Sequence, residues 1–370
     1  MSAFITRFDP GGGVGPRLAV KDLIDMAGVP TTAGCRAVAD EAKPATEDAA
    51  CLAGARAANA RVVGKANLHE LAFGGTGLNP WFGNPVNPLD PTRIPGGSSS
   101  GSAVAVGTGE ADVAFGSDTG GSVRTPSACC GTAGLKTTWG RIPVEGVWPL
   151  AQSLDTVGPM ARDVDGLLLG MQLLEPGFTL AGETPRAIGR FRGLDAEPGI
   201  DAALDRVLAA SELDVIDLEL PGWGAATAAG ATVLIVEAWA NDRRLLEQHP
   251  EGLGSDVRER LGLGASVTAE RLAWARGYKQ TWRDELAEAW ARVQLIALPT
   301  LVMFPPEIGD SGDRTVLANV AVNLAGHPAL ALPVPSGGPL PASLQLVGPD
   351  GAEDRLLAAG RVIEAAAGSL

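Results

Sequence analysis

The sequence predicts an α/β fold, a single large domain in which α-helices wrap a central mixed β-sheet. Short apolar runs of the kind that form strands alternate with longer segments of helical period along the chain. The 370 residues are 45% apolar and 19% charged, which is the composition of a globular protein with a large core. The length alone would also accommodate two smaller domains.

In the N-terminal half, the expected strands are short apolar runs, and the expected helices follow or precede them. One strand ends at Lys21 and another at Lys65, with a helix between them. A helix begins after Gly101, and an apolar run before Ser117 indicates a buried strand. In chain order, we expect a strand at 18–21, a helix at 48–60, a strand at 61–65, a helix at 101–107, a strand at 112–116 and a helix at 164–174.

The C-terminal half continues the alternation and contains two long segments of helical period. Two strands flank a helix, the long helices follow, and three strands and a terminal helix close the chain. The expected strands are 187–191, 215–218, 294–298, 329–333 and 343–347. The expected helices are 201–212, 225–248, 267–293 and 353–367.

The charge balance limits the kinds of partner. The net charge is −14 and the isoelectric point about 4.7, which argues against a general nucleic-acid surface or an anionic-membrane surface. No basic segment followed by an apolar one stands at the start, so we expect no secretory signal and a cytoplasmic location. The longest strongly apolar stretch, 231–240, is interrupted by Glu237 and is expected to be too short to span a bilayer.

The four cysteines, Cys35, Cys51, Cys129 and Cys130, are expected to be reduced thiols in a chain without a secretory signal. Because two of them lie close to a serine-rich block, a nitrilase-like set of a cysteine with Glu70 and Lys65 is conceivable. That alternative leaves the serine block unexplained.

The glycine- and serine-rich stretch from Gly96 to Ser122 bears most directly on function. Ser98 and Ser122 each follow a Gly-Gly pair, and an apolar segment separates them. Glycine allows consecutive N–H groups to point into one small space, which is the geometry that holds a developing oxyanion. The stretch therefore predicts a serine nucleophile at Ser122 beside an oxyanion hole formed by the N–H groups of Thr119, Gly120, Gly121 and Ser122.

Two other interpretations of this stretch explain less of it. A flexible linker has a similar composition, but Val104, Val113 and Phe115 make the surroundings apolar. A phosphate-binding loop would end in Lys-Ser or Lys-Thr, and no such pair follows the glycines here.

A serine nucleophile needs a base, and the sequence offers few. None of the three histidines, His69, His249 and His327, stands in a motif suited to a Ser-His-Asp triad. A lysine base is the other established solution. Both Lys21 and Lys65 end apolar runs, and the residues alone do not choose between them.

The chain resembles the amidase signature family. The motifs that carry the resemblance are 21–34, 64–70, the serine block 96–101 with 118–126, then 131–141, 153–159 and the C-terminal segment around 323–334. The resemblance covers most of the chain and is weakest between 180 and 293. It implies one amidase signature domain over 1–370, with a core at 17–165, a variable helical middle at 180–293, and C-terminal strands and a helix at 294–370 that return to the core.

The resemblance also implies the site residues. The family uses a Ser-Ser-Lys triad, which places the nucleophile at Ser122, the bridging serine at Ser98 in a cis peptide bond after Gly97, and the base at Lys21. Lys65 matches a family lysine that is not catalytic. Loop support falls to Ser99, Asp118 and Arg124, and the substrate pocket is expected to include Ala72, Gly74, Gly75 and Trp148.

The function implied is an amidohydrolase that cleaves a carboxylic amide, and also esters, anilides or carbamates, without metal or organic cofactor. The expected partner is a small-molecule amide, with no nucleic acid, no membrane and a homodimer as the candidate assembly. The alternative is the glutaminase-like A subunit of a tRNA-dependent amidotransferase, although such subunits are generally longer before the lysine. A catalytically inactive scaffold is a third interpretation, which the intact Lys21, Ser98 and Ser122 disfavour.

Overall fold

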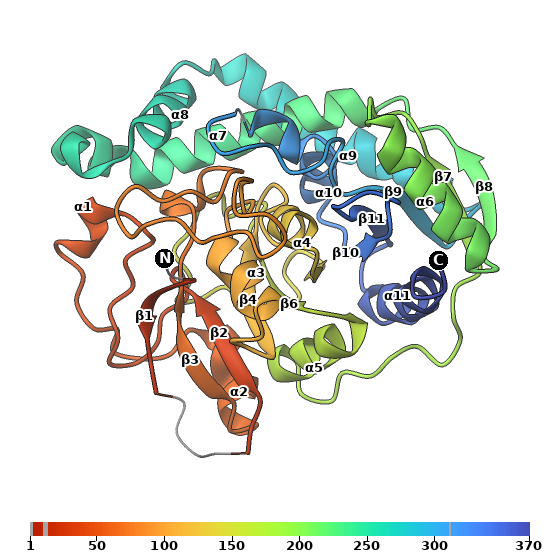
Figure 1. The fold of residues 1–370 in the computed structure, drawn as a ribbon. Coiled ribbons are helices and arrows are strands. Elements are labelled where there is room, and N and C mark those ends of the chain that lie inside the picture. Colours follow the sequence, from red (N-terminus) through yellow and green to blue (C-terminus); the bar gives the residue numbers. More distant parts are fainter. Residues whose placement is uncertain (1–2, 10–13, 311) are drawn as a thin grey trace.

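The computed structural model describes residues 3–9, 14–310 and 312–370, and within them the predicted fold class is confirmed. One mixed sheet of 11 strands forms the centre of a single domain, in the order β1-β3-β2-β4-β6-β5-β10-β11-β9-β7-β8 (Figure 1). The strands are β1 (Phe4–Arg7), β2 (Arg17–Lys21), β3 (Arg61–Ala66), β4 (Val113–Asp118), β5 (Ala133–Lys136), β6 (Thr156–Ala161), β7 (Ala187–Phe191), β8 (Asp214–Leu218), β9 (Leu295–Pro299), β10 (Ala329–Val334) and β11 (Ala342–Val347).

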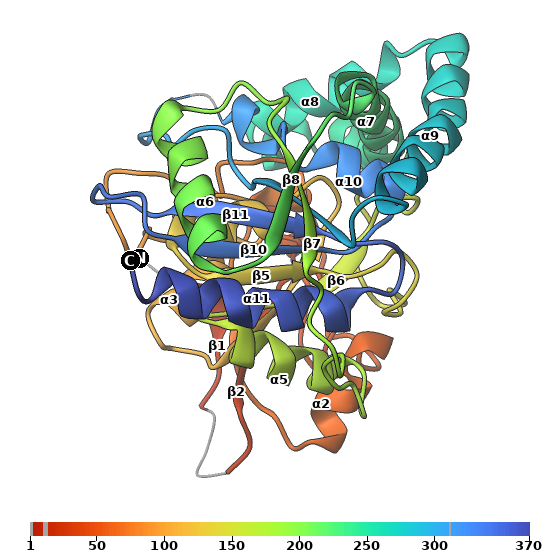
Figure 2. The ribbon, with the colours of Figure 1, turned by 90° about the vertical axis from the view of Figure 1, so that its right-hand side faces the viewer.

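The helices lie on both faces of the sheet. They are α1 (Arg36–Ala39), α2 (Ala53–Ala57), α3 (Ser100–Gly107), α4 (Arg124–Cys130), α5 (Val164–Leu174), α6 (Pro198–Ala210), α7 (Trp223–Gln248), α8 (Ser255–Ala265), α9 (Ala269–Trp290), α10 (Val320–Ala325) and α11 (Glu353–Ala367). Short 3₁₀ turns occur at Ala50–Leu52, Glu70–Ala72, Pro250–Gly252 and Asp313–Val316. Figure 2 shows α5 and α11 below β5, β10 and β11, and α7, α8 and α9 above them.

Successive side chains of β9 point alternately into two hydrophobic cores, one on each face of the sheet, because the side chains of a strand alternate with a period of two. Leu295 joins the core that α5, α6 and α11 cover, whereas Ile296 joins the core under α7, α9 and α10. Ala297 and Leu298 repeat the alternation. The sheet is therefore buried on both faces, as expected for a mixed sheet wrapped by helices.

The parallel pairs in the sheet fix the position of the serine block. β2 pairs in parallel with both β3 and β4, and Val20 lies opposite Phe115 of β4. Because parallel strands end at the same edge of a sheet, Lys21 and the residues that follow Phe115 lie close together. The C-terminal strand β10 pairs antiparallel with β5, so the last third of the chain packs beside this edge.

Most of the expected elements are present, but one helix was predicted too long. The segment 48–60 forms only the turn Ala50–Leu52 and the five residues of α2, because the backbone leaves the helical region at Asn59, where φ is +53°. The pattern also gave no indication of β1, β5, β6, α4, α8 or α10.

The apolar stretch 231–240 lies within the longer helix α7. α7 has 26 residues and is long and apolar enough to cross a membrane by length and composition. It buries Trp223, Ala226, Ala229 and Val233 in the core that it shares with α9 and α10. Such packing is that of a core helix.

Candidate active site

The two serines and the lysine of the proposed triad come from the ends of three different elements. Lys21 ends β2, Ser98 lies just before α3, and Ser122 lies in the turn between β4 and α4. The peptide bond between Gly97 and Ser98 is cis, as the resemblance implied. The backbone N–H of Ser99 donates to the carbonyl oxygen of Ser122 over 3.1 Å, which joins the two serine loops directly.

Lys21 is fully buried and contacts two serine hydroxyl groups. Its Nζ lies 2.7 Å from Ser98 Oγ and 2.8 Å from Ser117 Oγ. Burial penalises the charged ammonium and lowers the pKa of Lys21 to about 7, although the carboxylates of Asp118 and Asp155 act in the opposite direction. A lysine in this setting can lose its proton near neutral pH.

Lys65 is also fully buried but has different partners. Its Nζ lies 3.0 Å from Asp22 Oδ1, 2.6 Å from the carbonyl oxygen of Ile24 and 3.0 Å from Thr31 Oγ1. An ion pair and two further acceptors commit this amine to the fold. The sequence did not decide which of the two lysines is the candidate base. The geometry distinguishes them, because Lys21 contacts serine hydroxyl groups and Lys65 does not.

The three histidines contact carboxylates instead of the serines. His69 Nε2 lies 3.0 Å from Asp256 Oδ2, and His327 Nδ1 lies 2.6 Å from Asp350 Oδ1. His249 lies 3.6 Å from Glu41 at the surface. Each histidine therefore has a partner that accounts for it within the fold.

The four cysteines are free and buried, and burial raises the pKa of Cys129 to about 12. Glu70 does not complete a nitrilase-like set, because its carboxylate accepts hydrogen bonds from Trp81 Nε1 and the Gly254 N–H, each over 2.7 Å. The Lys65 amine is engaged with Asp22. The geometry does not support a cysteine nucleophile.

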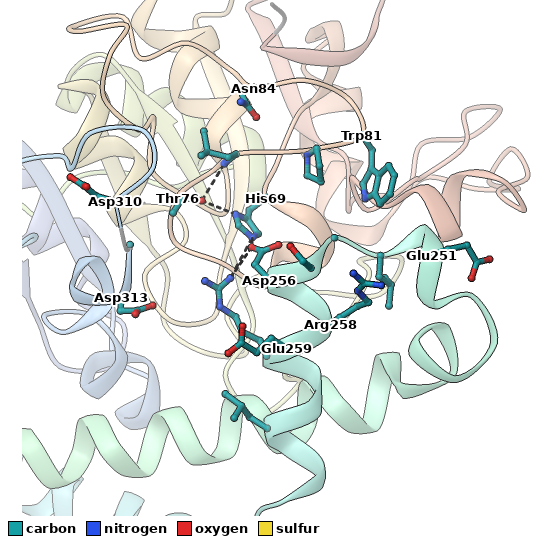
Figure 3. Close-up of a pocket in the computed structure, with 18 residues that line it drawn as sticks. His69, Thr76, Trp81, Asn84, Glu251, Asp256, Arg258, Glu259, Asp310 and Asp313 are labelled. Atoms are coloured by element: carbon teal, nitrogen blue, oxygen red, sulfur yellow. Dashed lines mark hydrogen bonds and ion pairs between the residues drawn. The ribbon is translucent and has the colours of Figure 1, made fainter.

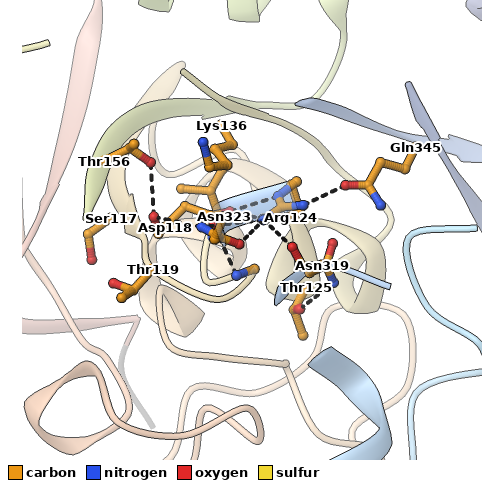
Figure 4. A network of polar contacts seen from close by, with 12 residues as sticks. Ser117, Asp118, Thr119, Arg124, Thr125, Lys136, Thr156, Asn319, Asn323 and Gln345 are labelled. Carbon is orange, nitrogen blue, oxygen red and sulfur yellow. Dashed lines mark hydrogen bonds and ion pairs between the residues drawn. The ribbon is translucent and has the colours of Figure 1, made fainter. Parts of the chain in front are cut away.

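A buried ion pair holds the loop that carries Ser122 (Figure 4). Arg124 donates two hydrogen bonds to Asp118, over 3.0 and 2.9 Å, and neither side chain is exposed. Burial works against the ionisation of Asp118, but the charge and hydrogen bonds of Arg124 outweigh it and hold the pKa of this carboxyl well below its usual range. Residues from distant segments complete the network: the side-chain oxygens of Asn323 and Gln345 and the backbone carbonyl oxygen of Asn319 accept hydrogen bonds from Arg124, and the Asn323 amide donates to Asp118.

The same carboxylate organises the backbone of the turn that carries Ser122. Asp118 accepts hydrogen bonds from the N–H groups of Gly121 and Val123, over 2.9 and 3.2 Å. The Gly121 N–H is thus directed at Asp118, which corrects its expected place among the oxyanion donors. Within the described residues, the N–H groups of Gly120 and Ser122 donate to no protein acceptor.

Two further residues of the block support the loops. Ser99 is buried, and its hydroxyl donates to the carbonyl oxygen of Ser117 over 3.3 Å. Thr119 donates its hydroxyl to Asp155 over 2.6 Å, and Asp155 also accepts the N–H groups of Leu150 and Ala151. These bonds tie the turn that carries Ser122 to the segment that precedes β6.

A cavity of about 190 Å³ opens at Ser122. Three of the residues expected in the substrate pocket, Ala72, Gly74 and Gly75, line it together with Gly97 and Gly120. Apolar side chains form most of the remaining wall: Phe73, Leu150, Ala231, Leu234, Ile235, Val316 and Val320. We call this space the inner cavity.

Trp148 does not line the inner cavity, and that expectation was wrong. Its backbone N–H donates to Leu23 and its indole Nε1 donates to Asp242 over 3.3 Å. The ring borders a separate surface hollow near Ala37, Val38 and Leu245. Trp148 is thus bonded to Leu23 and Asp242, and Leu150, two residues later in the chain, lines the inner cavity instead.

A second, larger cavity of about 1220 Å³ adjoins the inner one, and we call it the outer cavity (Figure 3). Arg260, Gly312 and Asp313 line both. Arg260 Nη1 donates to the carbonyl oxygen of Phe73 over 2.9 Å and lies 3.3 Å from Asp256. The remaining charged residues of the outer cavity are Glu251, Asp256, Arg258, Glu259 and Asp310.

Ser117, the second hydroxyl on Lys21, was not predicted from the sequence. Its signal was present, because Ser117 directly follows the strand expected at 112–116 and so reaches the same sheet edge as Lys21. Asn319, Asn323 and Arg260 were missed as well. They lie more than 130 residues from Ser122 in the chain and carry no local pattern.

A family model described as amidase matches residues 14–176 and 188–357. The chain belongs to the amidase family. The matched residues include Lys21, Ser98 and Ser122. It is therefore an amidase-signature enzyme, a class that acts on amide C–N bonds as hydrolase or amidotransferase.

Three relatives illustrate the range of the family. The A subunit of the glutamyl-tRNA(Gln) amidotransferase of Halobacterium salinarum is 33% identical over 423 aligned positions, covering 98% of this chain and 99% of the relative. The 2-amino-5-chloromuconic acid deaminase of Comamonas testosteroni is 34% identical, covering 99% of this chain and 86% of the relative. A solved amidase structure superposes with a TM-score of 0.88 at 32% identity, covering 95% of this chain and 84% of that one.

The alignment with the Halobacterium protein weakens the argument from length against an amidotransferase subunit. The expectation that amidotransferase A subunits are longer before the lysine does not separate the two functions, since this chain aligns with 99% of the Halobacterium protein. The alignment has more positions than this chain has residues, so the relative carries segments that this amidase lacks.

Proposed function

We propose that this amidase is a hydrolase of carboxylic amides that works through an acyl-enzyme on Ser122, with Ser98 and Lys21 completing a Ser-Ser-Lys triad. The observation that carries the proposal is the 2.7 Å contact between Lys21 Nζ and Ser98 Oγ, in a buried setting that lowers the pKa of the lysine to about 7. Near neutral pH, a substantial fraction of such a lysine is unprotonated and can accept a proton.

The proposed reaction uses these three side chains in turn. Ser122 Oγ attacks the carbonyl carbon, its proton passes to Ser98 Oγ, and Ser98 gives its own proton to Lys21 Nζ. The N–H groups of Gly120 and Ser122, with that of Thr119, stabilise the oxyanion. Lys21 then returns a proton through Ser98 to the nitrogen, the C–N bond breaks and the amine leaves. Water attacks the acyl-enzyme by the reverse relay, releases the acid and restores Ser122.

The substrate class in this proposal is a linear amide that is small enough to enter a cavity beside Ser122. Esters, anilides and carbamates present the same carbonyl to the same nucleophile, so they are included. The chain would act on small molecules in the cytoplasm, without nucleic acid or a membrane.

The second candidate is a glutaminase-like A subunit of a tRNA-dependent amidotransferase. It is favoured by the 33% identity to the Halobacterium protein over nearly the whole of both chains. The mostly apolar wall of the inner cavity argues for the first candidate, because free glutamine is a polar substrate. The discriminating test is whether the purified chain alone hydrolyses simple amides faster than glutamine.

The proposal is tested by labelling with a fluorophosphonate and intact-mass spectrometry. We expect one adduct on the wild type and on Ser336→Ala, a serine in the loop between β10 and β11, and none on Ser122→Ala. Hydrolysis of amides should be lost in Ser122→Ala and retained in Ser336→Ala. An adduct that persists on Ser122→Ala, or undiminished hydrolysis by that variant, would refute Ser122 as the nucleophile. Absence of any adduct would favour the inactive scaffold or a protein that needs its partners.

A further inference from the structure

We propose that the substrate carries a compact apolar acyl group, which lies in the inner cavity, while its amine portion faces the outer cavity. The side chains that contact the acyl group are Leu234 and Ile235 of α7, Val316 of the 3₁₀ turn and Val320 of α10. The inference rests on the proposed function, because it assigns the two sides of the amide that Ser122 would cleave. It names this chain's own specificity residues, two of which lie in the segment where the family resemblance is weakest.

The walls of the inner cavity lie directly against the nucleophile turn. A Cβ atom placed on Gly120 would lie 3.2 Å from Leu234 Cδ1 and 3.5 Å from Val320 Cγ2. These two side chains therefore flank the turn between Asp118 and Ser122. An acyl group bonded to Ser122 Oγ would meet them within its first few carbon atoms.

Gly75 and Val316 form another part of the cavity wall, where two segments of the chain pack closely. A Cβ atom on Gly75 would lie 2.6 Å from Thr315 Oγ1 and 3.7 Å from Val316 Cγ1. Any side chain at position 75 would therefore collide with the 3₁₀ turn that carries Val316. Glycine at position 75 therefore lets its segment pack directly against this turn, which keeps the inner cavity narrow beside Val316.

The volume limits the acyl group. Pockets for drug-sized ligands enclose roughly 300–1,000 Å³. The inner cavity has about 190 Å³, so its occupant is smaller than such ligands. An apolar wall of this size rewards close fit, since one methylene more or less in a hydrophobic pocket changes selectivity about 10- to 200-fold.

The amine portion is assigned to the outer cavity by the order of the reaction. The acyl group stays bonded to Ser122 while the amine leaves, so the amine needs a route out. The outer cavity, at about 1220 Å³, shares Arg260, Gly312 and Asp313 with the inner one and is rich in charged side chains (Figure 3). It is large enough, and carries enough charged side chains, to receive a bulky amine that the inner cavity would exclude.

The test is a series of N-acyl p-nitroanilides from acetyl to decanoyl, with kcat/KM measured for each. The wild type should prefer a short acyl chain and lose at least about 10-fold activity on decanoyl. Leu234→Ala enlarges the inner cavity and should move the preference toward longer chains. Leu246→Ala, the same change on the same helix but outside the cavity lining, should keep the wild-type profile.

A filling variant covers the case in which Leu234→Ala does not fold. Val316→Phe should abolish activity on the longer acyl chains while it retains activity on acetyl. The inference is overturned if folded Leu234→Ala and Val316→Phe both keep the wild-type order of substrates. That outcome differs from failure of the proposed function, in which Ser122→Ala would keep its activity on all of them.

Discussion

Two buried lysines in this amidase show how partners decide what a residue can do. Lys65 faces a carboxylate, whereas Lys21 faces two hydroxyl groups. Burial without a directly paired carboxylate is what lowers the pKa of Lys21 to about 7. The sequence presents both lysines at the ends of similar apolar runs, and only their surroundings distinguish them.

The lowered pKa of Lys21 predicts the pH dependence of the reaction. The base must be neutral, so log kcat/KM should rise with a slope near one below about pH 7 and level off above it. The measurement is kcat/KM from pH 5 to 9, with circular dichroism at each pH to exclude unfolding. Lys136 is a suitable control, because burial also lowers its pKa to about 7 but its Nζ donates to the carbonyl oxygens of Thr137 and His327 and not to a serine hydroxyl of the described residues. Folded Lys136→Met should keep the inflection, and a flat wild-type profile would contradict the assignment of Lys21.

Ser117 is predicted to orient the base. A neutral amine that donates to Ser117 Oγ can aim its lone pair at Ser98, so Ser117→Ala should lower kcat about 10- to 100-fold with little change in KM. Ser117→Thr keeps the hydroxyl and should restore most of the rate. Equal losses in the Ala and Thr variants would mean that Ser117 only fills space.

At the scale of elements, the turn that carries Ser122 is held from outside. Asp118 ends β4 and Arg124 begins α4, and the residues that complete their hydrogen bonds come from α10 and β11. The sequence could predict the serines and the lysine because they form a dense local motif. It could not predict Asn319, Asn323 or Gln345, because single amides about 200 residues away show no pattern until the chain is folded.

The buried ion pair predicts a large loss of stability when one partner is removed. Arg124→Met leaves the Asp118 carboxylate buried without its charge partner, which typically costs about 3–5 kcal/mol of the free energy of unfolding. Urea denaturation should report this loss. The control is Arg361→Gln, which breaks the exposed pair with Asp165 and should cost less than about 1 kcal/mol. Similar losses of unfolding free energy in the two variants would show that the buried pair contributes no more to stability than an exposed pair.

At the scale of the whole molecule, the sequence predicted the α/β class and most strands, because buried strands are continuous apolar runs. It missed β6, where Gly158 and Pro159 interrupt the pattern, although this strand lies between β4 and β5. Proline is uncommon inside a sheet, so the sequence argued against the strand that is present. It also misplaced Trp148, because an aromatic residue near a motif carries no information about the side to which it points.

The position of β10 in the sheet has a consequence for synthesis on the ribosome. In the strand order, β10 joins the block that ends with β5 to the block that begins with β11. All three residues of the proposed triad have been made by residue 122, yet Asn323 and Gln345 emerge only with the last part of the chain. A growing chain therefore carries the proposed nucleophile, Ser122, long before the residues that support its turn exist. Reactivity would appear only when the nearly complete polypeptide folds back on its own beginning.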